Sequence, residues 1–210
     1  MGIFLIGANG FLGKSIIKHS EGSNIIPWSH NLQSDANYFN LLDPNTWDNL
    51  LSEKPKKVIF LSWPGVRNYY ETYHLTENLV YSIKLFEKLT EIGVEKIVYS
   101  GTCFEYGLIN GCLKENFTTN PVSLYGIAKD SLRKAAYQIT KGTKTNLCWI
   151  RVFYPYGREQ NINSLFPSLL KSIKNKEKFF NLSSGRQIRD FINSKDLANN
   201  FIKIIDSPKS

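Results

Sequence analysis

The chain opens with four apolar residues that run directly into three glycines, in the stretch IFLIGANGFLG. An unbroken apolar run at residues 3–6 is typical of a strand buried on both faces, and the apolar residues after it recur at helical spacing. Gly7, Gly10 and Gly13 therefore fall where a strand turns into a helix. Glycine lets the main chain approach a ligand there, and the N–H groups of a helix start favour an anion such as a diphosphate. The alternative is an ordinary tight turn that needs glycine for geometry alone.

Similar apolar runs recur along the chain, separated by helical patterns. We expect these further strands at residues 24–28, 57–62, 96–100 and 146–151. Strands that alternate with helices predict an α/β fold, a doubly wound parallel sheet with helices on both faces. The clearest helices are expected at residues 76–92 and 125–141, and Asp43 followed by Pro44 predicts the start of a shorter one. Beyond Gly157 the pattern loosens, with helices expected near residues 164–175 and 194–205.

Composition and charge exclude several classes of protein. The chain has 210 residues, 42% of them hydrophobic, enough to bury a core as one domain with a small appendage. No stretch approaches the roughly 20 apolar residues that span a bilayer, so we expect a cytoplasmic enzyme with no membrane partner. Cys103, Cys112 and Cys148 lack the even count of a disulfide framework and the CxxC spacing of a zinc site, so we expect reduced thiols and no metal.

The formal net charge of +8 raises the question of a nucleic-acid partner. The lysines are scattered through helices and turns without a run of five or more basic residues, so we expect no nucleic-acid binding. A mildly positive cleft that attracts a phosphorylated small molecule explains the same charge, and so do solvated surface lysines.

Motifs that can carry chemistry follow one another in order along the chain. In YGIAK, Tyr125 and Lys129 stand about one helical turn apart on one face, where a lysine can lower the pKa of the phenol and hydrogen-bond a ribose. In YSGTCFEYG, Ser100 and Thr102 bring hydroxyl groups to the carboxyl end of a strand, the edge at which open α/β sheets bind ligands. RVFYPYG at residues 151–157 follows the next strand in the same way.

With these motifs the chain resembles the extended short-chain dehydrogenase/reductase family, in its branch of NAD(P)-dependent sugar-nucleotide epimerases, dehydratases and reductases. The resemblance covers nearly the whole chain, in the order GANGFLG, VIFLSW, YSGTCFEYG, YGIAK and RDFINSKDLA. It implies a Rossmann-type fold, a nucleotide-diphosphate sugar as substrate, a role in polysaccharide synthesis, and a homodimer formed by the helices at residues 76–92 and 125–141.

The resemblance also implies two domains. Residues 1–157 would form the NAD(P)-binding Rossmann domain, and residues 158–210 a small, partial substrate-binding region whose last helix can pack back on the first domain. Members of the family usually continue past the RDF segment with further strands and helices. We therefore expect either that part of the substrate region lies outside this chain or that the chain is a short form.

Individual residues take their expected roles from the same resemblance. Tyr125 is the acid/base that moves a proton to or from a sugar hydroxyl, and Thr102 hydrogen-bonds the reacting oxygen. Lys129 holds the nicotinamide ribose and lowers the Tyr125 pKa. Phe104 and Tyr154 join Thr102 and Tyr125 in the substrate site, Tyr154 at a position often held by asparagine. The residues expected to contact the cofactor are Gly7, Asn9, Gly10, Phe11, Leu12, Ser29, Asn40, Leu41, Leu61, Ser62, Trp63, Ser100, Tyr125, Lys129, Phe153 and Pro155.

Departures from the family pattern narrow the reaction. Dehydratases of the family carry Asp-Glu directly after the threonine, where this chain has Cys103 and Phe104, so we expect no 4,6-dehydration. Epimerisation at C4 of a nucleotide-activated sugar, or oxidation or reduction there, remains. Residues 25–30 offer no acid for a ribose 2′-OH, and Ser29, His30 or Asn31 could donate a hydrogen bond to a 2′-phosphate. We therefore expect NADP rather than NAD as the cofactor.

A protein of another class, a dinucleotide-binding sensor or scaffold without turnover, would keep the same fold. The intact set of Thr102, Tyr125 and Lys129 favours an enzyme, because a sensor has no chemical need for the tyrosine and lysine pair.

Overall fold

The computed structural model describes residues 2–31, 33 and 35–208, and it contains a six-stranded sheet in the order β3-β2-β1-β4-β5-β6. All neighbouring strands in this sheet are parallel. The strands are β1 (Ile3–Ile6), β2 (Ile25–Ser29), β3 (Asn37–Tyr38), β4 (Lys57–Phe60), β5 (Lys96–Thr102) and β6 (Asn146–Val152). Because β1 pairs with both β2 and β4, the direction of winding reverses there, which confirms the predicted doubly wound sheet.

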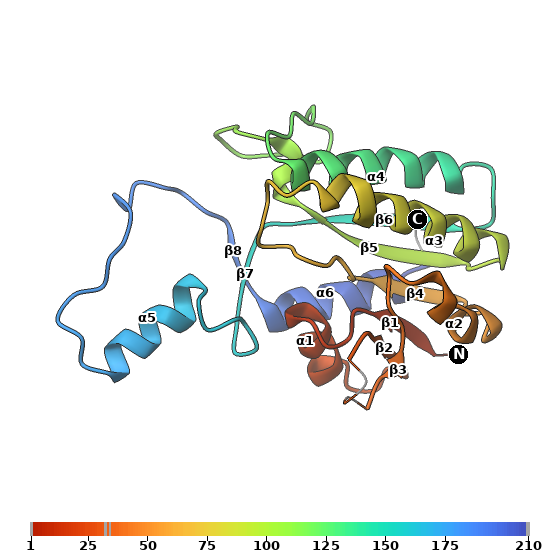
Figure 1. Cartoon of the computed structure of the whole chain (residues 1–210), viewed down its shortest axis with the longest axis horizontal. Helices are drawn as coiled ribbons and strands as arrows, with labels where there is room; N and C mark the ends of the chain where they lie inside the picture. The colour runs from red at the N-terminus through yellow and green to blue at the C-terminus, as the bar shows by residue number, and fades with distance from the viewer. Residues whose placement is uncertain (1, 32, 34, 209–210) are drawn as a thin grey trace.

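Helices cover both faces of the sheet (Figure 1). On one face α3 (Val80–Glu91) lies beside α4 (Leu124–Thr140), and on the other α1 (Phe11–His19) lies beside α6 (Ser194–Asp206). Alternate residues of β1 serve the two cores, since Phe4 packs with the α3 and α4 side and Leu5 with the α1 and α6 side. Among the described residues, no helix has the length and apolar character needed to cross a membrane.

Local signals set where several helices begin. Asp43 accepts a hydrogen bond from the N–H of Asn45, and Pro44 opens the short 3-10 turn η1 (Pro44–Thr46), as the Asp-Pro pair predicts. The helix α2 (Asp48–Ser52) follows it. The helix expected from residue 76 begins earlier than predicted, as a π-helical turn, η2 (His74–Leu79), that continues into α3. A wider turn of this kind has no simple pattern of residue types.

After β6 the chain leaves the main sheet. It forms β7 (Tyr154–Tyr156), α5 (Leu165–Lys174) and β8 (Phe191–Asn193), and β7 pairs with β8 in a two-stranded parallel sheet that the sequence did not predict. The segment with α5 extends away from the main body, whereas α6 returns to it (Figure 1). Ser15 Oγ in α1 donates to the main-chain oxygen of Ser194 at 2.8 Å, which ties the start of α6 to α1 on this face of the main sheet.

Candidate active site

The glycine turn after β1 brings main chain close to main chain at the carboxyl edge of the sheet. Gly7 has a φ of +94°, and a Cβ there would lie 2.9 Å from the main-chain nitrogen of Ser62. A Cβ on Gly13 would lie 2.3 Å from the oxygen of Gly7. Within the described residues no side chain caps the start of α1, so its first N–H groups can face an anion. This geometry fits a dinucleotide diphosphate, whose binding here stays a prediction.

The other residues predicted to contact the cofactor are spread over the carboxyl ends of several strands. Ser29 is buried at the end of β2, and its Oγ accepts from the N–H of Asn31 at 3.1 Å, so the hydroxyl already orders the turn. Asn40 Oδ1 accepts from the N–H of Leu42 at 3.1 Å, and Leu41 is a core residue. Gly10 is exposed. Trp63 is buried. The others are half-buried: Asn9, Phe11, Leu12, Leu61, Ser62, Ser100, Phe153 and Pro155.

Tyr125 and Lys129 lie one turn apart on α4, and both are buried. The Lys129 ammonium donates to the main-chain oxygen of Ser100 at 2.8 Å and to the Tyr99 hydroxyl at 3.1 Å. It also lies 4.3 Å from the centre of the Trp63 ring, close enough for a cation–π contact. Groups of the protein thus enclose the ammonium, and the ribose contact expected of Lys129 stays a prediction.

Thr102 ends β5, and its side chain lies close enough to the phenol of Tyr125 to lower the pKa of that phenol. Thr102 Oγ1 also accepts from the N–H of Phe104 at 3.3 Å. Aromatic rings surround the phenol with centroid separations of 5.3 to 6.1 Å. They belong to Trp63, Tyr69, His74 and Phe104. These rings pack around the Tyr125 ring and exclude water from it.

Burial changes the protonation of both central groups. Loss of solvent raises the pKa of Tyr125 above its ordinary value, and the polar side chain of Thr102 opposes part of this rise. Loss of solvent lowers the pKa of Lys129 to about 7, against the opposite effect of the Glu105 carboxylate. Both changes follow from the cost of a charge away from water. The predicted lowering of the Tyr125 pKa therefore meets a larger opposing effect, the burial of the phenol itself.

Cys103 and Tyr154 lie near each other beyond the end of β5, because the side chains of Thr102 and Tyr154 both act to lower the pKa of the Cys103 thiol, which burial raises. The Arg189 guanidinium lies 5.0 Å from the centre of the Tyr154 ring. The N–H of Tyr154 donates to the oxygen of Asp190 at 3.1 Å. Arg189 and Asp190, which precede β8, thus contact the first residue of β7.

Sequence reasoning missed His74, which is fully buried next to Tyr125. Trp63 Nε1 donates to His74 Nδ1 at 3.0 Å, so the proton of the neutral ring is on Nε2, 3.0 Å from the oxygen of Asn68. Burial also lowers the pKa of His74, which favours the neutral ring. Only the structure places His74 beside Tyr125, because the π-helical turn that positions His74 was not predicted from the sequence.

Comparisons with known proteins agree with this architecture. The chain is 29% identical to dTDP-6-deoxy-L-talose 4-dehydrogenase (NAD(+)) of Aggregatibacter actinomycetemcomitans, over 94% of this chain and 77% of that protein. It is 24% identical to GDP-6-deoxy-D-talose 4-dehydrogenase of the same organism, over 98% of this chain and 70% of that protein. The names of these relatives give the predicted preference for NADP no support, since the first specifies NAD.

Solved structures show the same fold. A UDP-glucuronic acid 4-epimerase from Bacillus cereus, in complex with UDP-glucuronic acid and NAD, matches with a TM-score of 0.84 at 22% identity, over 100% of this chain and 74% of that chain. UDP-glucose 4-epimerase from Thermotoga maritima matches with a TM-score of 0.85 at 18% identity, over 98% of this chain and 74% of that chain. The sequence model of the NAD dependent epimerase/dehydratase family matches residues 3–210. The chain therefore belongs to this family of enzymes, as its motifs predict.

Proposed function

We propose that the protein is an NAD-dependent oxidoreductase that acts at C4 of a nucleotide-activated sugar, with Thr102, Tyr125 and Lys129 as its catalytic residues. The observation that carries the proposal is their convergence at the end of β5, where the Thr102 side chain acts on the pKa of the Tyr125 phenol and the Lys129 ammonium donates to the main-chain oxygen of Ser100 at 2.8 Å. The relatives named as 4-dehydrogenases support the reacting carbon. C4 epimerisation is the second candidate, favoured by the similarity to 4-epimerases of known structure.

Each catalytic residue has one task in this reaction. In the oxidation, Tyr125 as phenolate accepts the proton of the C4 hydroxyl, and in the reduction it returns that proton to the ketone oxygen. Thr102 holds the same oxygen by a hydrogen bond, and the positive charge of Lys129 favours the phenolate. A bound nicotinamide supplies the hydride exchange at C4. The glycine turn, whose close contacts exclude a Cβ, would hold its diphosphate.

Phe104 supports a nucleotide-activated 6-deoxy sugar as substrate. Its ring packs on Tyr69 at 4.6 Å and on Tyr125 at 5.8 Å, which makes this side of the site apolar and suits a methyl group at C6. The neighbouring thiol of Cys103 has a pKa raised by burial and so is a poor proton carrier. We therefore propose that 4,6-dehydration, which needs an additional acid and base, lies outside this activity.

Other expectations stay proposals. Val80 on α3 and Ile127 and Tyr137 on α4 are exposed, and we propose that this helix pair forms a homodimer. We also propose that residues 1–157 bind the cofactor, that residues 158–210 belong to the substrate region, and that the enzyme works in the cytoplasm.

The test is a substrate screen with the purified protein. Wild type is incubated with NAD or NADP and with dTDP-, GDP- and UDP-linked hexoses, 6-deoxyhexoses and 4-keto sugars, and products are identified by mass spectrometry and NMR. We expect change at C4 of a 6-deoxy sugar with NAD, and none with Tyr125→Phe. A protein that binds NAD but alters no sugar would contradict the proposal and favour the sensor alternative.

A further inference from the structure

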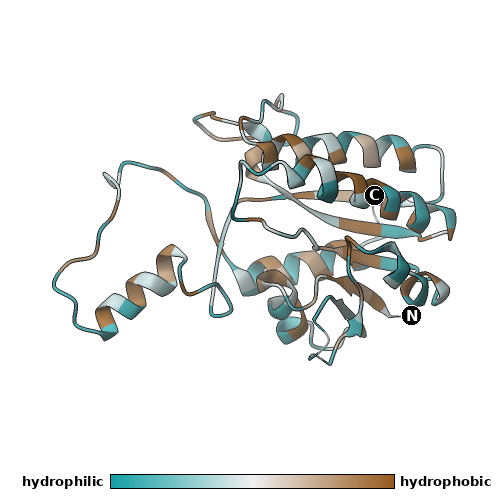
Figure 2. Cartoon of the chain, in the orientation of Figure 1, coloured by the Kyte–Doolittle hydropathy of each residue, from teal (hydrophilic) through white to brown (hydrophobic). Residues whose placement is uncertain are grey.

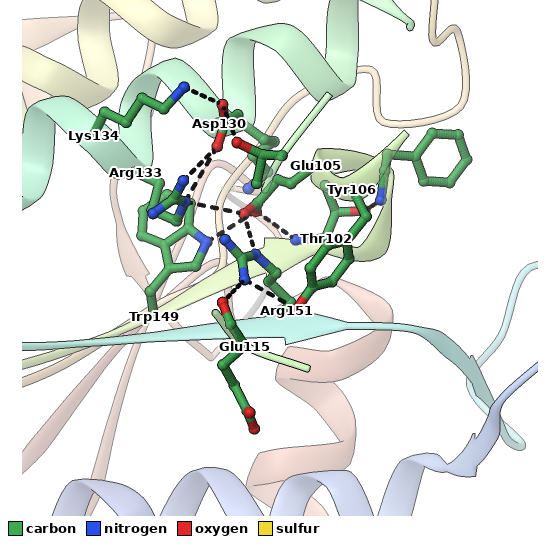
Figure 3. A network of polar contacts seen from close by, with 12 residues as sticks. Thr102, Glu105, Tyr106, Glu115, Asp130, Arg133, Lys134, Trp149 and Arg151 are labelled. Atoms are coloured by element: carbon green, nitrogen blue, oxygen red, sulfur yellow. Dashed lines mark hydrogen bonds and ion pairs between the residues drawn. The ribbon is translucent and has the colours of Figure 1, made fainter. Parts of the chain in front are cut away.

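A buried carboxylate that the proposed reaction does not use stands behind the catalytic end of β5 (Figure 3). Glu105 belongs to the 3-10 turn η3 (Cys103–Tyr106) and is fully buried. Its Oε2 lies 2.8 Å from Nε of Arg151 and 3.5 Å from Nε of Arg133. A buried charge is costly unless it is paired, and these two cations supply the pairing.

The other oxygen of this carboxylate holds the main chain of Thr102. Glu105 Oε1 accepts from the N–H of Thr102 at 2.9 Å, while the side chain of Thr102 caps the turn that carries Glu105. The neighbouring Gly101 leaves room for this contact, because a Cβ there would lie 2.6 Å from Glu105 Oε1. The carboxylate thus fixes the direction in which the chain leaves β5, and with it the Thr102 hydroxyl.

A second line of contacts leads from the same carboxylate to Lys129. Trp149 Nε1 donates to Glu105 Oε1 at 2.9 Å. The Trp149 ring stacks on the Tyr99 ring with centroids 4.3 Å apart, and the Tyr99 hydroxyl accepts from Lys129 Nζ at 3.1 Å. The contact is therefore continuous from the carboxylate to the ammonium.

We propose that Glu105 is a positioning residue of the active site, whose carboxylate orients Thr102, fixes Lys129 through Trp149 and Tyr99, and supplies negative charge that keeps Lys129 protonated. This inference rests on the proposed function, which gives Thr102 and Lys129 their catalytic roles. Glu105 itself touches neither substrate nor cofactor in the proposed reaction.

The charges around the site act in the same direction. The Glu105 carboxylate raises the pKa of Lys129, in opposition to burial. The other ionisable groups that face these two residues come from four elements: Tyr99 of β5, Tyr125, Arg133 and Tyr137 of α4, His74 of η2 and Arg151 of β6. Loss of the carboxylate would remove an attraction for the ammonium and leave the Arg151 guanidinium without its ion-pair partner, whereas Arg133 keeps the Asp130 carboxylate at 2.7 Å. Both changes at Glu105 disfavour protonated Lys129.

The decisive variant is Glu105→Gln, which keeps the size and one oxygen of the side chain but removes its charge. Lys129 is titrated by NMR in protein with ¹³C-labelled lysine and no cofactor, with its signal assigned by its loss in Lys129→Met. We expect the midpoint to move to lower pH by about one unit. In the active enzyme, kcat/KM should fall with rising pH as Lys129 loses its proton, and in Glu105→Gln this fall should begin about one pH unit lower. At pH values above the fall, kcat/KM of the variant should be about tenfold lower than that of wild type.

Two further variants separate charge from position. Glu115→Gln makes the same chemical change in a residue that meets the network only through its main-chain oxygen, 2.9 Å from Arg151 Nη1, and it should leave both profiles unchanged. Glu105→Asp keeps the charge but shortens the side chain, so we expect lower kcat with an unchanged KM for NAD and a Lys129 midpoint near that of wild type.

A folded Glu105→Gln protein whose Lys129 midpoint and pH limb do not move would overturn the inference. If circular dichroism shows that this variant does not fold, Glu105→Asp decides, and a wild-type kcat in that variant would overturn the inference. A moved Lys129 midpoint in a protein without sugar activity would support the electrostatic role of Glu105 while contradicting the proposed function.

Discussion

The end of β5 and the segment around α5 were both expected from the spacing of apolar residues, β5 as a strand and α5 as a helix, yet the two regions differ sharply in packing. At the end of β5, Thr102, Glu105 and Lys129 are buried; the N–H of Thr102 donates to the Glu105 carboxylate, and Lys129 donates to the main-chain oxygen of Ser100. Between residues 173 and 191, which the structure describes in full, Phe180 alone is not exposed. Figure 2 shows hydrophobic residues along α5 although it stands apart, and Leu170 and Ile173 are 66% and 64% exposed.

The two regions are held in place by different kinds of contact. Around β5 the geometry comes from contacts between residues far apart in sequence, such as the Glu105 and Arg151 ion pair at 2.8 Å. In α5 it comes mainly from hydrogen bonds within the helix, since its apolar side chains contribute little burial. Substitutions near β5 should therefore change activity or stability strongly, and substitutions on α5 weakly.

The largest effect is expected at the centre of the first region. Tyr125→Phe removes only the titrating hydroxyl, so turnover should fall at least about a hundredfold while the Kd for NAD stays nearly unchanged. Discontinuous assays of product formation measure the turnover, and fluorescence titration with NADH measures the affinity for the cofactor. Turnover close to that of wild type would remove Tyr125 from the mechanism.

A second test addresses the glycine turn. Gly13→Ala places a Cβ 2.3 Å from the oxygen of Gly7, so the turn must open and NAD binding should weaken by on the order of tenfold or more. Calorimetric titration of NAD gives the affinity. Gly142→Ala, at a glycine with no atom near the added Cβ, is the comparison variant for the loss of glycine, although its φ of +76° adds local strain. Equal NAD affinity in both variants would argue against the turn as the diphosphate site.

A third prediction concerns pH. Folding lowers the pKa of Lys129 from 10.5 to about 7, so between these values the unfolded chain binds a proton that the folded protein releases. Stability contributed by this group therefore rises with pH across that window. Urea unfolding at several pH values from about 6 to 9 should show a steeper rise for wild type than for Lys129→Met. Parallel curves would mean that Lys129 is not enclosed as the structure has it.

The smallest effect is expected on α5. Leu170→Ala should change the free energy of unfolding by no more than about 0.5 kcal/mol, because the side chain is 66% exposed. Leu132→Ala on α4, where the same side chain is fully buried, should cost about 2–5 kcal/mol. Denaturant titration of both variants measures the contrast. A large loss for Leu170→Ala would show that α5 has partners that bury it.

Much of the fold was predictable because the spacing of apolar residues along the sequence depends on whether the backbone is a helix or a strand. The runs at β1, β4, β5 and β6 predicted strands at nearly the observed positions, and Asp43 with Pro44 marked a helical start. The two-residue strand β3 was not predictable, since both of its residues are exposed and it is defined by its pairing with β2. The pairing of β7 with β8 likewise joins residues more than thirty positions apart in sequence.

For the candidate site, the sequence by itself determined which side chains share a turn or a strand end: Tyr125 with Lys129, and Ser100 with Thr102. These relations need only the geometry of one helix or one strand. The tertiary structure decided that Glu105 would meet Arg133 of α4 and Arg151 of β6, and that His74 would lie beside Tyr125. Such contacts depend on strand order and on the packing of helices against the sheet. The spacing of residues along the chain predicts neither strand order nor helix packing. Hydrogen bonds and ion pairs depend on the distance between groups in space, and residues far apart in sequence can be close in space.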